Sequence, residues 1–242
     1  MTARDVKIYG RNACEALFRA RPGDVRRAFV NERTARAMGA MLSELARRRL
    51  PYRVVSDEEL ARVAGSQHHE GVCLVARPRP EPDERAVFAV RGPARAVYLD
   101  GVENPHNVGA ILRTAAHFGV IALAGARDRL PAPAGAVARV AEGGAEHVPV
   151  VRFADPLASL RALSKEFALV ATAHDARESV FEARLPERCV ILLGAEGRGL
   201  SAKVRALASM AVAIPGTGAV ESLNVASAAA VLLAEHYRRF GR

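Results

Sequence analysis

The sequence predicts an α/β fold in which a small N-terminal α/β domain precedes a larger domain built on a parallel sheet. Short apolar runs alternate with helical patterns along almost the whole chain, and this alternation is typical of parallel strands covered by helices on both faces. A segment with three prolines at alternate positions, Arg77–Arg85, divides the pattern in two; such a segment favours an extended connector. Two later apolar runs lead into glycine-rich loops, at the strand ends where such sheets bind ligands.

The first part of the chain, residues 1–76, has the patterns of a compact α/β domain. Asn12 is placed to cap a helix, and Ser56-Asp-Glu-Glu59 matches a capping box. Methionines and leucines recur at helical spacing over 33–49. We therefore predict strands at residues 25–30, 52–55 and 72–76, and helices over 12–18, 33–49 and 57–64.

Residues 77–95 are predicted to form a proline- and arginine-rich linker, and residues 96–242 the second domain. Its strands are near-continuous apolar runs, as expected where both faces of a sheet are buried. The predicted strands are 96–99, 120–124, 148–151, 169–173, 190–193 and 210–214. Helical patterns are found at 108–118, 136–141, 156–167, 202–207 and 224–240.

Composition narrows the class of protein. Half of the 242 residues are hydrophobic, yet no apolar run approaches the roughly 18 residues of a membrane span, and the polar start lacks an apolar leader. We therefore expect a cytoplasmic protein. The three cysteines, Cys14, Cys73 and Cys189, are far apart and predict neither a disulfide framework nor a zinc site. His68-His69-Glu70 are adjacent, and adjacent side chains rarely converge on one ion, so we predict no metal.

The chain carries a formal net charge of +9, which favours a polyanionic partner. Residues 1–95 hold 19 basic and 12 acidic side chains, a net of +7, whereas the remainder holds 16 and 14, a net of +2. The N-terminal domain is therefore expected to contact nucleic acid. A GC-rich genome is the alternative source, because 32 of the 35 basic residues are arginine. The residues predicted to bind RNA are Arg11, Arg47, Arg48, Arg49 and His69, although an arginine cluster at a helix end also suits the helix dipole.

A dinucleotide site is the first alternative for the glycine-rich loops. Gly197-Arg-Gly-Leu-Ser-Ala202 matches G-x-G-x-x-A. Three residues separate it from the preceding strand, however, and the next strand ends in Ile214-Pro215 with no acid to hold a ribose. A nicotinamide cofactor is therefore not expected, and no P-loop motif is present.

Three loops of similar form point instead to one composite site. They are Leu99–Thr114, Leu193–Ser201 and Ile214–Val225, and each follows an apolar run and leads into a helical pattern. Glycine lets the backbone take positive φ and approach a ligand closely. Polar side chains in these loops, Glu196 and Asn224 among them, are expected to face that ligand.

These loops resemble the three signature motifs of the SpoU (TrmH-type) branch of the SPOUT RNA methyltransferases. The first motif is matched by Asn107 and Arg113. The second is matched by Gly194, Glu196, Gly199 and Ser201, and the third by Ile214, Pro215, Gly218, Ser222, Leu223, Asn224 and Val225. The N-terminal part, from Lys7 to Val72, looks like the substrate-binding domain that many members carry.

The resemblance implies S-adenosylmethionine as methyl donor and a ribose 2′-hydroxyl in rRNA or tRNA as acceptor. It also implies a catalytic domain over 96–242 with a C-terminal trefoil knot, and a homodimer formed through that domain. The residues implied to bind the donor are Leu193, Gly194, Gly199, Ile214, Gly218, Ser222 and Leu223. Those implied in catalysis are Arg113, Asn107, Glu196, Ser222 and Asn224.

Arg113 lies in a helix that is otherwise apolar, small or hydroxylic. Because a guanidinium stays protonated in proteins, it suits an electrostatic stabiliser of a developing alkoxide better than a base. The alternative is a structural ion pair with Glu103 or Glu196. Asn107 and Ser222 have an alternative role as helix caps, and Glu196 as a loop carboxylate bonded to backbone amides.

Two positions depart from the family pattern. Gly216 replaces a larger residue after Ile-Pro, and Glu70 stands where many members have Gln. Gly216, with the arginine-rich N-terminus, is also the ground for an alternative function, a non-catalytic RNA-binding or ribosome-assembly factor that keeps the fold.

Overall fold

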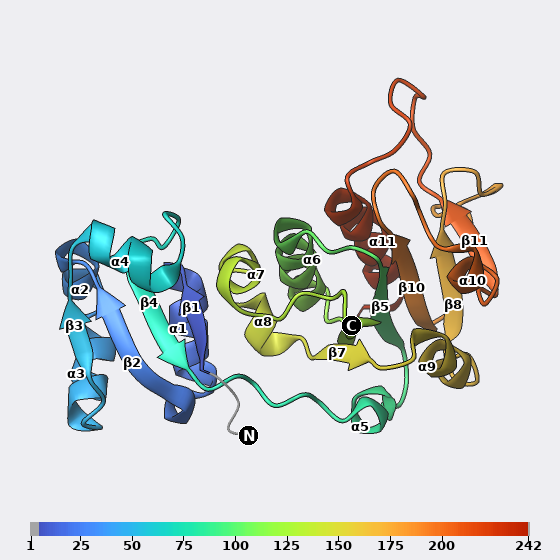
Figure 1. Cartoon of the computed structure of the whole chain (residues 1–242). Helices are drawn as coiled ribbons and strands as arrows, with labels where there is room; N and C mark the ends of the chain where they lie inside the picture. Colours follow the sequence, from blue (N-terminus) through green and yellow to red (C-terminus); the bar gives the residue numbers. More distant parts are fainter. Residues whose placement is uncertain (1–4, 242) are drawn as a thin grey trace. The chain divides into compact units, whose positions relative to one another are not determined.

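The computed structural model describes residues 5–241 (Figure 1). The chain divides into two compact units. Unit 1 comprises Met1–Pro80 together with Ala132–His147, and unit 2 comprises Glu81–Pro131 together with Val148–Arg242. Residues 1–4 and 242, which belong to the two predicted domains, lie outside the described residues.

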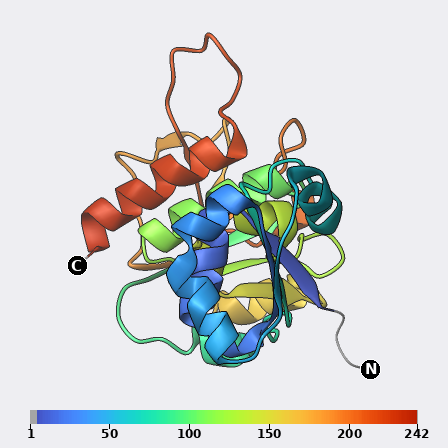
Figure 2. The same cartoon turned by 90° about the vertical axis from the view of Figure 1, so that its left-hand side faces the viewer.

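Unit 1 is built on a four-stranded sheet in the order β1-β4-β2-β3. β4 runs antiparallel to β1 and β2, and β3 runs parallel to β2. Figure 2 shows the strands between helices on both sides. The elements are β1 (Val6–Tyr9), α1 (Arg11–Ala20), a 3-10 turn (Pro22–Asp24), β2 (Val25–Val30), α2 (Glu32–Ala37), α3 (Gly39–Arg47), β3 (Tyr52–Val54), α4 (Asp57–Ala64), β4 (Val72–Ala76), α7 (Gly135–Val140) and α8 (Gly144–His147).

The predicted helix over 33–49 is two helices. Asn31 caps α2 through its side chain, which accepts a hydrogen bond from the backbone N–H of Thr34. The backbone then leaves helical geometry at Met38 (φ −105°, ψ 27°), and α3 begins at Gly39. The apolar spacing that predicted one helix continues across this break because Met38, like the apolar residues of α3, is buried in the core. The capping box at Ser56 is confirmed, since its hydroxyl accepts from the N–H of Glu59.

The segment with α7 and α8 belongs to unit 1, although it lies between strands of unit 2 in the sequence. Ala138 joins the apolar core beneath β1 and α1. Arg21 donates two hydrogen bonds to the carboxylate of Glu146, at 2.8 and 3.1 Å, and both side chains are largely buried. Only a short helix over 136–141 was expected here, and α8 was missed because its four residues are too few to show a period.

Unit 2 contains a seven-stranded parallel sheet in the order β7-β6-β5-β10-β8-β11-β9. The parallel sheet predicted from the apolar runs is confirmed. Its elements are α5 (Glu84–Phe88), β5 (Ala94–Asp100), α6 (Pro105–His117), β6 (Ala122–Ala126), β7 (Val150–Phe153), α9 (Pro156–Leu163), β8 (Ala168–Thr172), β9 (Glu178–Ser179), β10 (Arg188–Gly194), α10 (Ala202–Arg205), β11 (Met210–Ala213) and α11 (Val225–Phe240).

Two helical layers cover this sheet. Side chains from α5, α9 and α10 pack into the core on one face, while α11 packs against α6 and β10 (Figure 1). β10 is inserted between β5 and β8, with Val190 opposite Ala96 on one side and Leu169 on the other. The order of strands along the chain therefore differs from their order in the sheet. The trefoil knot stays a prediction.

The segment 77–95 is not extended throughout. Asp83 caps α5, and Phe88 is 5% exposed with its ring edge-on to that of Phe167, 5.8 Å between centroids. This segment therefore contributes to the core of unit 2 from Glu84 onward. No helix between residues 5 and 241 is long and apolar enough to cross a membrane.

Candidate functional site

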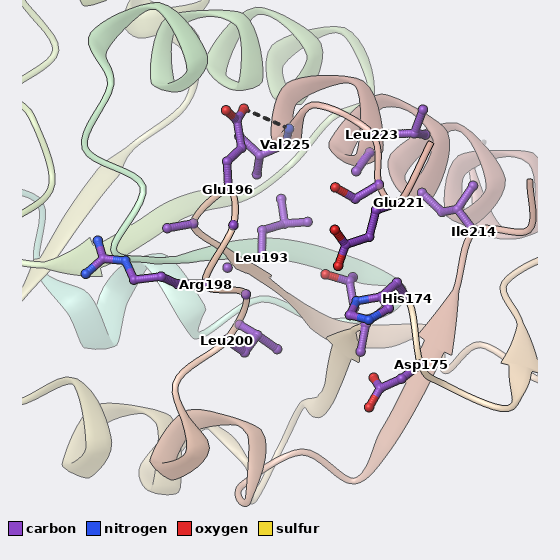
Figure 3. Close-up of a pocket in the computed structure, with 18 of the residues that line it drawn as sticks. His174, Asp175, Leu193, Glu196, Arg198, Leu200, Ile214, Glu221, Leu223 and Val225 are labelled. Atoms are coloured by element: carbon purple, nitrogen blue, oxygen red, sulfur yellow. Dashed lines mark hydrogen bonds between the residues drawn. The ribbon is translucent and has the colours of Figure 1, made fainter. Parts of the chain in front are cut away.

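A cavity of about 300 Å³ lies beyond the carboxyl ends of β8, β10 and β11 in unit 2 (Figure 3). Parallel strands present their ligand sites at this edge. The walls combine backbone and apolar side chains with charged side chains from the loops after these strands. The lining residues that the sequence also assigned to donor binding or catalysis are Leu193, Gly194, Glu196, Gly199, Ile214, Ser222 and Leu223. Gly218 is the one predicted donor-binding residue that is not among those lining the cavity.

The loop after β10 folds back tightly on itself. A Cβ added to Gly194 would lie 2.1 Å from the carbonyl carbon of Gly199, far inside van der Waals contact. Ala195 pairs with Gly199 in an antiparallel bridge, and Gly199 has φ of +64°. Glycine at 194 is therefore required by space, and glycine at 199 is favoured by its backbone conformation.

Asp100, the last residue of β5, holds this loop in place. Its carboxylate accepts a 2.7 Å hydrogen bond from the backbone N–H of Ser201, and its backbone carbonyl accepts from the N–H of Ala195 at 3.1 Å. Asp100 was not among the site residues predicted from the sequence. Its signal was available, because Asp100 is a carboxylate at the carboxyl end of a buried apolar run, directly before the first polar loop.

Three of the predicted catalytic side chains meet in one hydrogen-bond network. Asn107 donates from Nδ2 to Oε1 of Glu196 at 3.0 Å, and Asn224 donates from Nδ2 to the same oxygen at 2.6 Å. Asn224 Nδ2 also lies 3.1 Å from Oδ1 of Asn107. The backbone N–H of Val225 reaches Glu196 Oε1 at 3.4 Å, as drawn in Figure 3. The network joins all three sequence motifs.

The residues that cap α6 and α11 are not those considered as caps from the sequence. Asn104, not Asn107, caps α6. Asn224, not Ser222, caps α11, because its Oδ1 accepts hydrogen bonds from the backbone N–H groups of Ala226 and Ser227. The cap interpretation of Asn107 and Ser222 was therefore wrong. Asn224 has two functions, because its carbonyl oxygen caps the helix while its amide nitrogen binds Glu196.

Arg113 is exposed on α6 and is not among the residues that line the cavity. It makes no ion pair or hydrogen bond through its side chain within residues 5–241. Glu103 pairs instead with Arg129 at 2.8 Å, and Glu196 binds the two asparagines. The structural ion pairs considered for Arg113 are thus absent from the described part of the chain. Its guanidinium is free to meet a ligand.

The cavity also contains charged side chains that were not predicted from the sequence. Nη2 of Arg205 donates to both carboxylate oxygens of Asp175, at 2.9 and 3.0 Å, which lowers the pKa of the Asp175 carboxyl. His174 and Glu221 project toward each other across the cavity (Figure 3). The sequence held one indication of His174 and Asp175, because both directly follow the apolar run of β8.

The residues predicted to bind RNA lie in unit 1 in different settings. Arg47 and Arg48 both donate to Glu44, and their hydrogen bonds lower the pKa of the Glu44 carboxyl to about 2. Arg11 donates from Nε to Glu15 at 3.1 Å, and Arg49 is exposed.

His69 is 6% exposed, and its Nδ1 accepts from the backbone N–H of Gly71. We correct its assignment, since a buried ring that holds a turn is not presented to RNA. Glu70 accepts from the backbone N–H of Arg11 and lies 3.7 Å from Arg139, so it too has a structural role.

Across residues 5–241, no three His, Cys, Asp or Glu side chains are grouped to hold a metal ion. The three cysteines are buried and unpaired, and burial raises the pKa of each thiol. A Cβ added to Gly216 would meet no atom within 4 Å, so this departure from the family pattern leaves open space at that point of the loop.

Comparison with known proteins agrees with the motifs. Residues 94–234 match the model of the SpoU rRNA methylase family, and residues 7–82 match the model of the RNA 2′-O ribose methyltransferase substrate-binding domain. The chain belongs to the SpoU rRNA methylase family. Together the two matches define an RNA 2′-O-ribose methyltransferase.

Individual relatives cover almost the whole chain. The 23S rRNA (guanosine-2′-O-)-methyltransferase RlmB of Bordetella pertussis is 34% identical over 96% of both chains. An uncharacterised tRNA/rRNA methyltransferase, YfiF of Escherichia coli O157:H7, is 34% identical over 98% of this chain and 69% of its own length. A solved RNA 2′-O ribose methyltransferase superposes with a TM-score of 0.79 at 27% identity, covering 98% and 89% of the two chains. The SpoU methyltransferase AviRb of Streptomyces viridochromogenes, solved with AdoMet, has the same fold, with a TM-score of 0.79 at 24% identity over 97% and 90%.

Proposed function

We propose that this enzyme methylates a ribose 2′-hydroxyl of ribosomal RNA with S-adenosylmethionine as donor. The network of Asn107, Glu196 and Asn224 beside the glycine-built cavity is the observation that carries the proposal. Relatives such as the RlmB proteins, named for 23S rRNA, favour ribosomal RNA as the substrate. An RNA of this kind is met in the bacterial cytoplasm, which fits the expected location.

The cavity fits the proposed donor. Part of its wall is backbone from the loop after β10 and apolar side chains including Leu193, Ile214 and Leu223, which suit the flat adenosine of the donor. The tight turn at Gly194 removes side-chain bulk where a ligand approaches the backbone. When bound, the donor supplies an electrophilic methyl group on a sulfonium.

The polar network is proposed to orient the acceptor ribose. Glu196 Oε1 already accepts from the two asparagines, whereas Oε2 has no hydrogen-bond partner within residues 5–241. That second oxygen is therefore free to accept a hydrogen bond from substrate. Ser222 lines the same cavity and is proposed as a further positioning residue. Positioning of the reacting groups can lower the activation barrier of methyl transfer by several kcal/mol, and by roughly 7–11 kcal/mol in the best cases.

Arg113 is proposed to stabilise the developing alkoxide and to bind the adjacent phosphate. The Arg113 side chain is exposed and has no ion pair or hydrogen bond within residues 5–241. Both observations support this role, because an arginine that only stabilises the fold is usually paired. The homodimer implied by the resemblance is part of the same proposal, and the exposed aromatic side chains of Phe181 (50%) and Tyr237 (40%) are surfaces that a second copy can cover.

The test combines donor binding with methylation. Calorimetric titration with S-adenosylmethionine and S-adenosylhomocysteine should give saturable binding, and the absence of heat at millimolar ligand would refute the proposal. Arg113→Ala should abolish methyl transfer to ribosomal RNA while leaving donor affinity within about twofold. Ribose-methylation mapping in a deletion strain should reveal one nucleotide that loses its methyl group. The non-catalytic alternative, which the comparisons do not favour, predicts no such nucleotide.

A further inference from the structure

One face of the sheet in unit 1 is covered by α4 over only part of its area. Tyr9, Phe29 and Cys73 form an apolar cluster with Leu60 and Ala64 of α4. These three strand residues stand in one row across β1, β4 and β2, because Cys73 is paired with both Tyr9 and Phe29. In the next row the sheet is more exposed, and Val75 is only partly buried.

The next row on the same face carries cations. Lys7 and Arg27 are both paired with Val75 of β4, and residues two apart on a strand share a face. Lys7 and Arg27 are exposed, while Val75 is partly buried between them. Arg27 also places its guanidinium 6.0 Å from the ring centroid of Phe29, which confirms that it faces this side.

Two further arginines extend the same surface. Arg53 of β3 is paired with Phe29, and its side chain is 62% exposed. Arg77 follows β4 in phase with Val75 and is exposed. We call Lys7, Arg27, Arg53 and Arg77 the basic sheet face.

Carboxylates offset this charge only in part. Glu59 lies 3.2 Å from Arg53, and the exposed Asp5 precedes β1 in phase with Lys7. Within residues 5–241 the side chains of Lys7, Arg27 and Arg77 have no ion pair.

The arginine cluster at the end of α3 differs in this respect. Glu44 engages both Arg47 and Arg48, at 2.7 and 2.5 Å. Glu44 thus offsets part of the positive charge of this cluster, although both arginines keep exposed N–H groups. In the described part of the chain, Arg49 is then the one cation of that cluster without an ion pair. The basic sheet face has three cations without one.

We propose that the basic sheet face binds the phosphate backbone of the substrate RNA. This inference rests on the proposed function, since it places the RNA contact of that same enzyme. Neighbouring strands lie about 4.8 Å apart, so the side chains from β1 to β3 span roughly 15 Å of nearly flat surface. Lysine and arginine side chains make most backbone contacts to nucleic acids, and a flat row of them can follow several phosphates of one strand. Each contact releases counterions and therefore leaves a signature in the salt dependence of binding.

The experiment compares two variants of the full-length chain with the same change in charge. One carries Lys7→Gln, Arg27→Gln and Arg77→Gln, and the control carries Arg47→Gln, Arg48→Gln and Arg49→Gln. Filter binding to protein-free 23S ribosomal RNA is measured from 50 to 300 mM KCl. The sheet-face variant should raise Kd on the order of 10- to 100-fold and reduce the slope of log K against log salt by about 2 to 3, as expected for three lost phosphate contacts. The control, which removes the arginines at the end of α3 that the sequence predicted to bind RNA, should raise Kd less than the sheet-face variant does.

Several outcomes would overturn the proposal. Equal weakening by both variants would show an effect of net charge alone, and stronger weakening by the control would place the contact at the end of α3. An unchanged Kd for the sheet-face variant would exclude RNA from this surface. If the triple variant melts early by circular dichroism, single variants Lys7→Gln and Arg77→Gln are used, and Arg27→Lys should retain binding. Titration of the same proteins with S-adenosylmethionine tests the proposed function separately. If the unmodified chain does not bind the donor, the proposed function is refuted, whereas the comparison of RNA binding between the two variants still holds.

Discussion

Asn224 donates a 2.6 Å hydrogen bond to Glu196, and Glu196 Oε1 also accepts from Asn107 at 3.0 Å. One carboxylate oxygen thereby joins the first turn of α6, the loop after β10 and the start of α11. Hydrogen bonds to a charged group are worth about 1.5–3 kcal/mol each, more than neutral ones. Glu196 is therefore as much the organiser of the three motifs as a candidate to touch substrate.

Two substitutions at Glu196 separate these functions. Glu196→Gln keeps an oxygen that can accept from both asparagines, so donor affinity should stay within about twofold, while kcat falls because the free carboxylate oxygen is replaced. Glu196→Ala removes the network, and kcat should fall on the order of 100-fold or more, since misplacing reacting groups by about 1 Å costs that much. Single-turnover methylation and donor titration measure the two effects. If kcat of Glu196→Gln equals that of the wild type, the negative charge of Glu196 has no role in the reaction.

Glycine at position 194 can be tested against a matched glycine. Gly194→Ala places a methyl group 2.1 Å from backbone of Gly199, and the loop must open to accept it. We expect donor affinity to fall at least tenfold, with a lower melting temperature. Gly216→Ala is the control, because its Cβ would meet nothing within 4 Å, and donor affinity should be nearly unchanged. Normal donor binding by Gly194→Ala would show that the loop adjusts freely.

Asp100 is expected to act on donor binding through the loop it holds. Asp100→Ala leaves the N–H of Ser201 without its acceptor, and a lost hydrogen bond to a charged group of about 1.5 kcal/mol corresponds to a roughly tenfold rise in donor Kd. Asp100→Asn retains an acceptor oxygen and should restore most of that affinity. Calorimetric titration measures both variants. A fall in kcat without a change in donor Kd would assign Asp100 another function.

The sequence predicted the parts of the fold that depend on local patterns. β2 and β4 have the predicted bounds, because buried apolar runs between polar residues define strands clearly, and the cap at Ser56 follows from side-chain chemistry over four residues. The motifs also indicated which polar residues would gather, and Asn107, Glu196 and Asn224 do so.

What the sequence did not reveal depends on contacts between distant segments. The inclusion of residues 132–147 in unit 1 rests on pairs such as Arg21 with Glu146, 125 positions apart, and no local period reports them. The pairing of Arg47 and Arg48 with Glu44 is, in contrast, local, at three and four positions, and it was missed because only the positive charge of the cluster was considered. Asp100 was overlooked because its role depends on a loop about 100 residues later.

The carboxylate of Glu235 should make unit 2 sensitive to acid. Hydrogen bonds from Arg238 and Arg239 lower its pKa from the usual 4.5 to about 2, and Arg239 also binds the carbonyls of Val180 and Phe181. Because the folded state lowers this pKa, the stabilisation is complete above about pH 4.5 and is lost as the pH falls from there toward 2.

Urea unfolding at pH 7 and at pH 3 tests this expectation. Glu235→Gln should be less stable than wild type at pH 7. The difference should shrink at pH 3, because the unfolded wild type then binds a proton at Glu235 that the folded state, with its pKa of about 2, does not. A constant difference between the two pH values would assign the cost to packing rather than to ionisation.

The pair of Arg21 and Glu146 should decide whether residues 132–147 stabilise unit 1. The two side chains are 15% and 8% exposed, and removing one partner of a buried pair leaves an uncompensated charge that costs about 3–5 kcal/mol. Asp24, 3.2 Å from Arg21, still compensates part of that charge, so Glu146→Ala should lower the free energy of unfolding by a smaller amount, about 2 kcal/mol. The control is Glu166→Ala, which removes an exposed partner of Arg188 in unit 2 and should cost less than about 1 kcal/mol. Hydrogen exchange locates the effect: faster exchange in β1 and α1 of Glu146→Ala, with unit 2 unchanged, is the expected result. Equal protection of unit 1 in both variants would mean that the pair of Arg21 and Glu146 adds nothing to its stability.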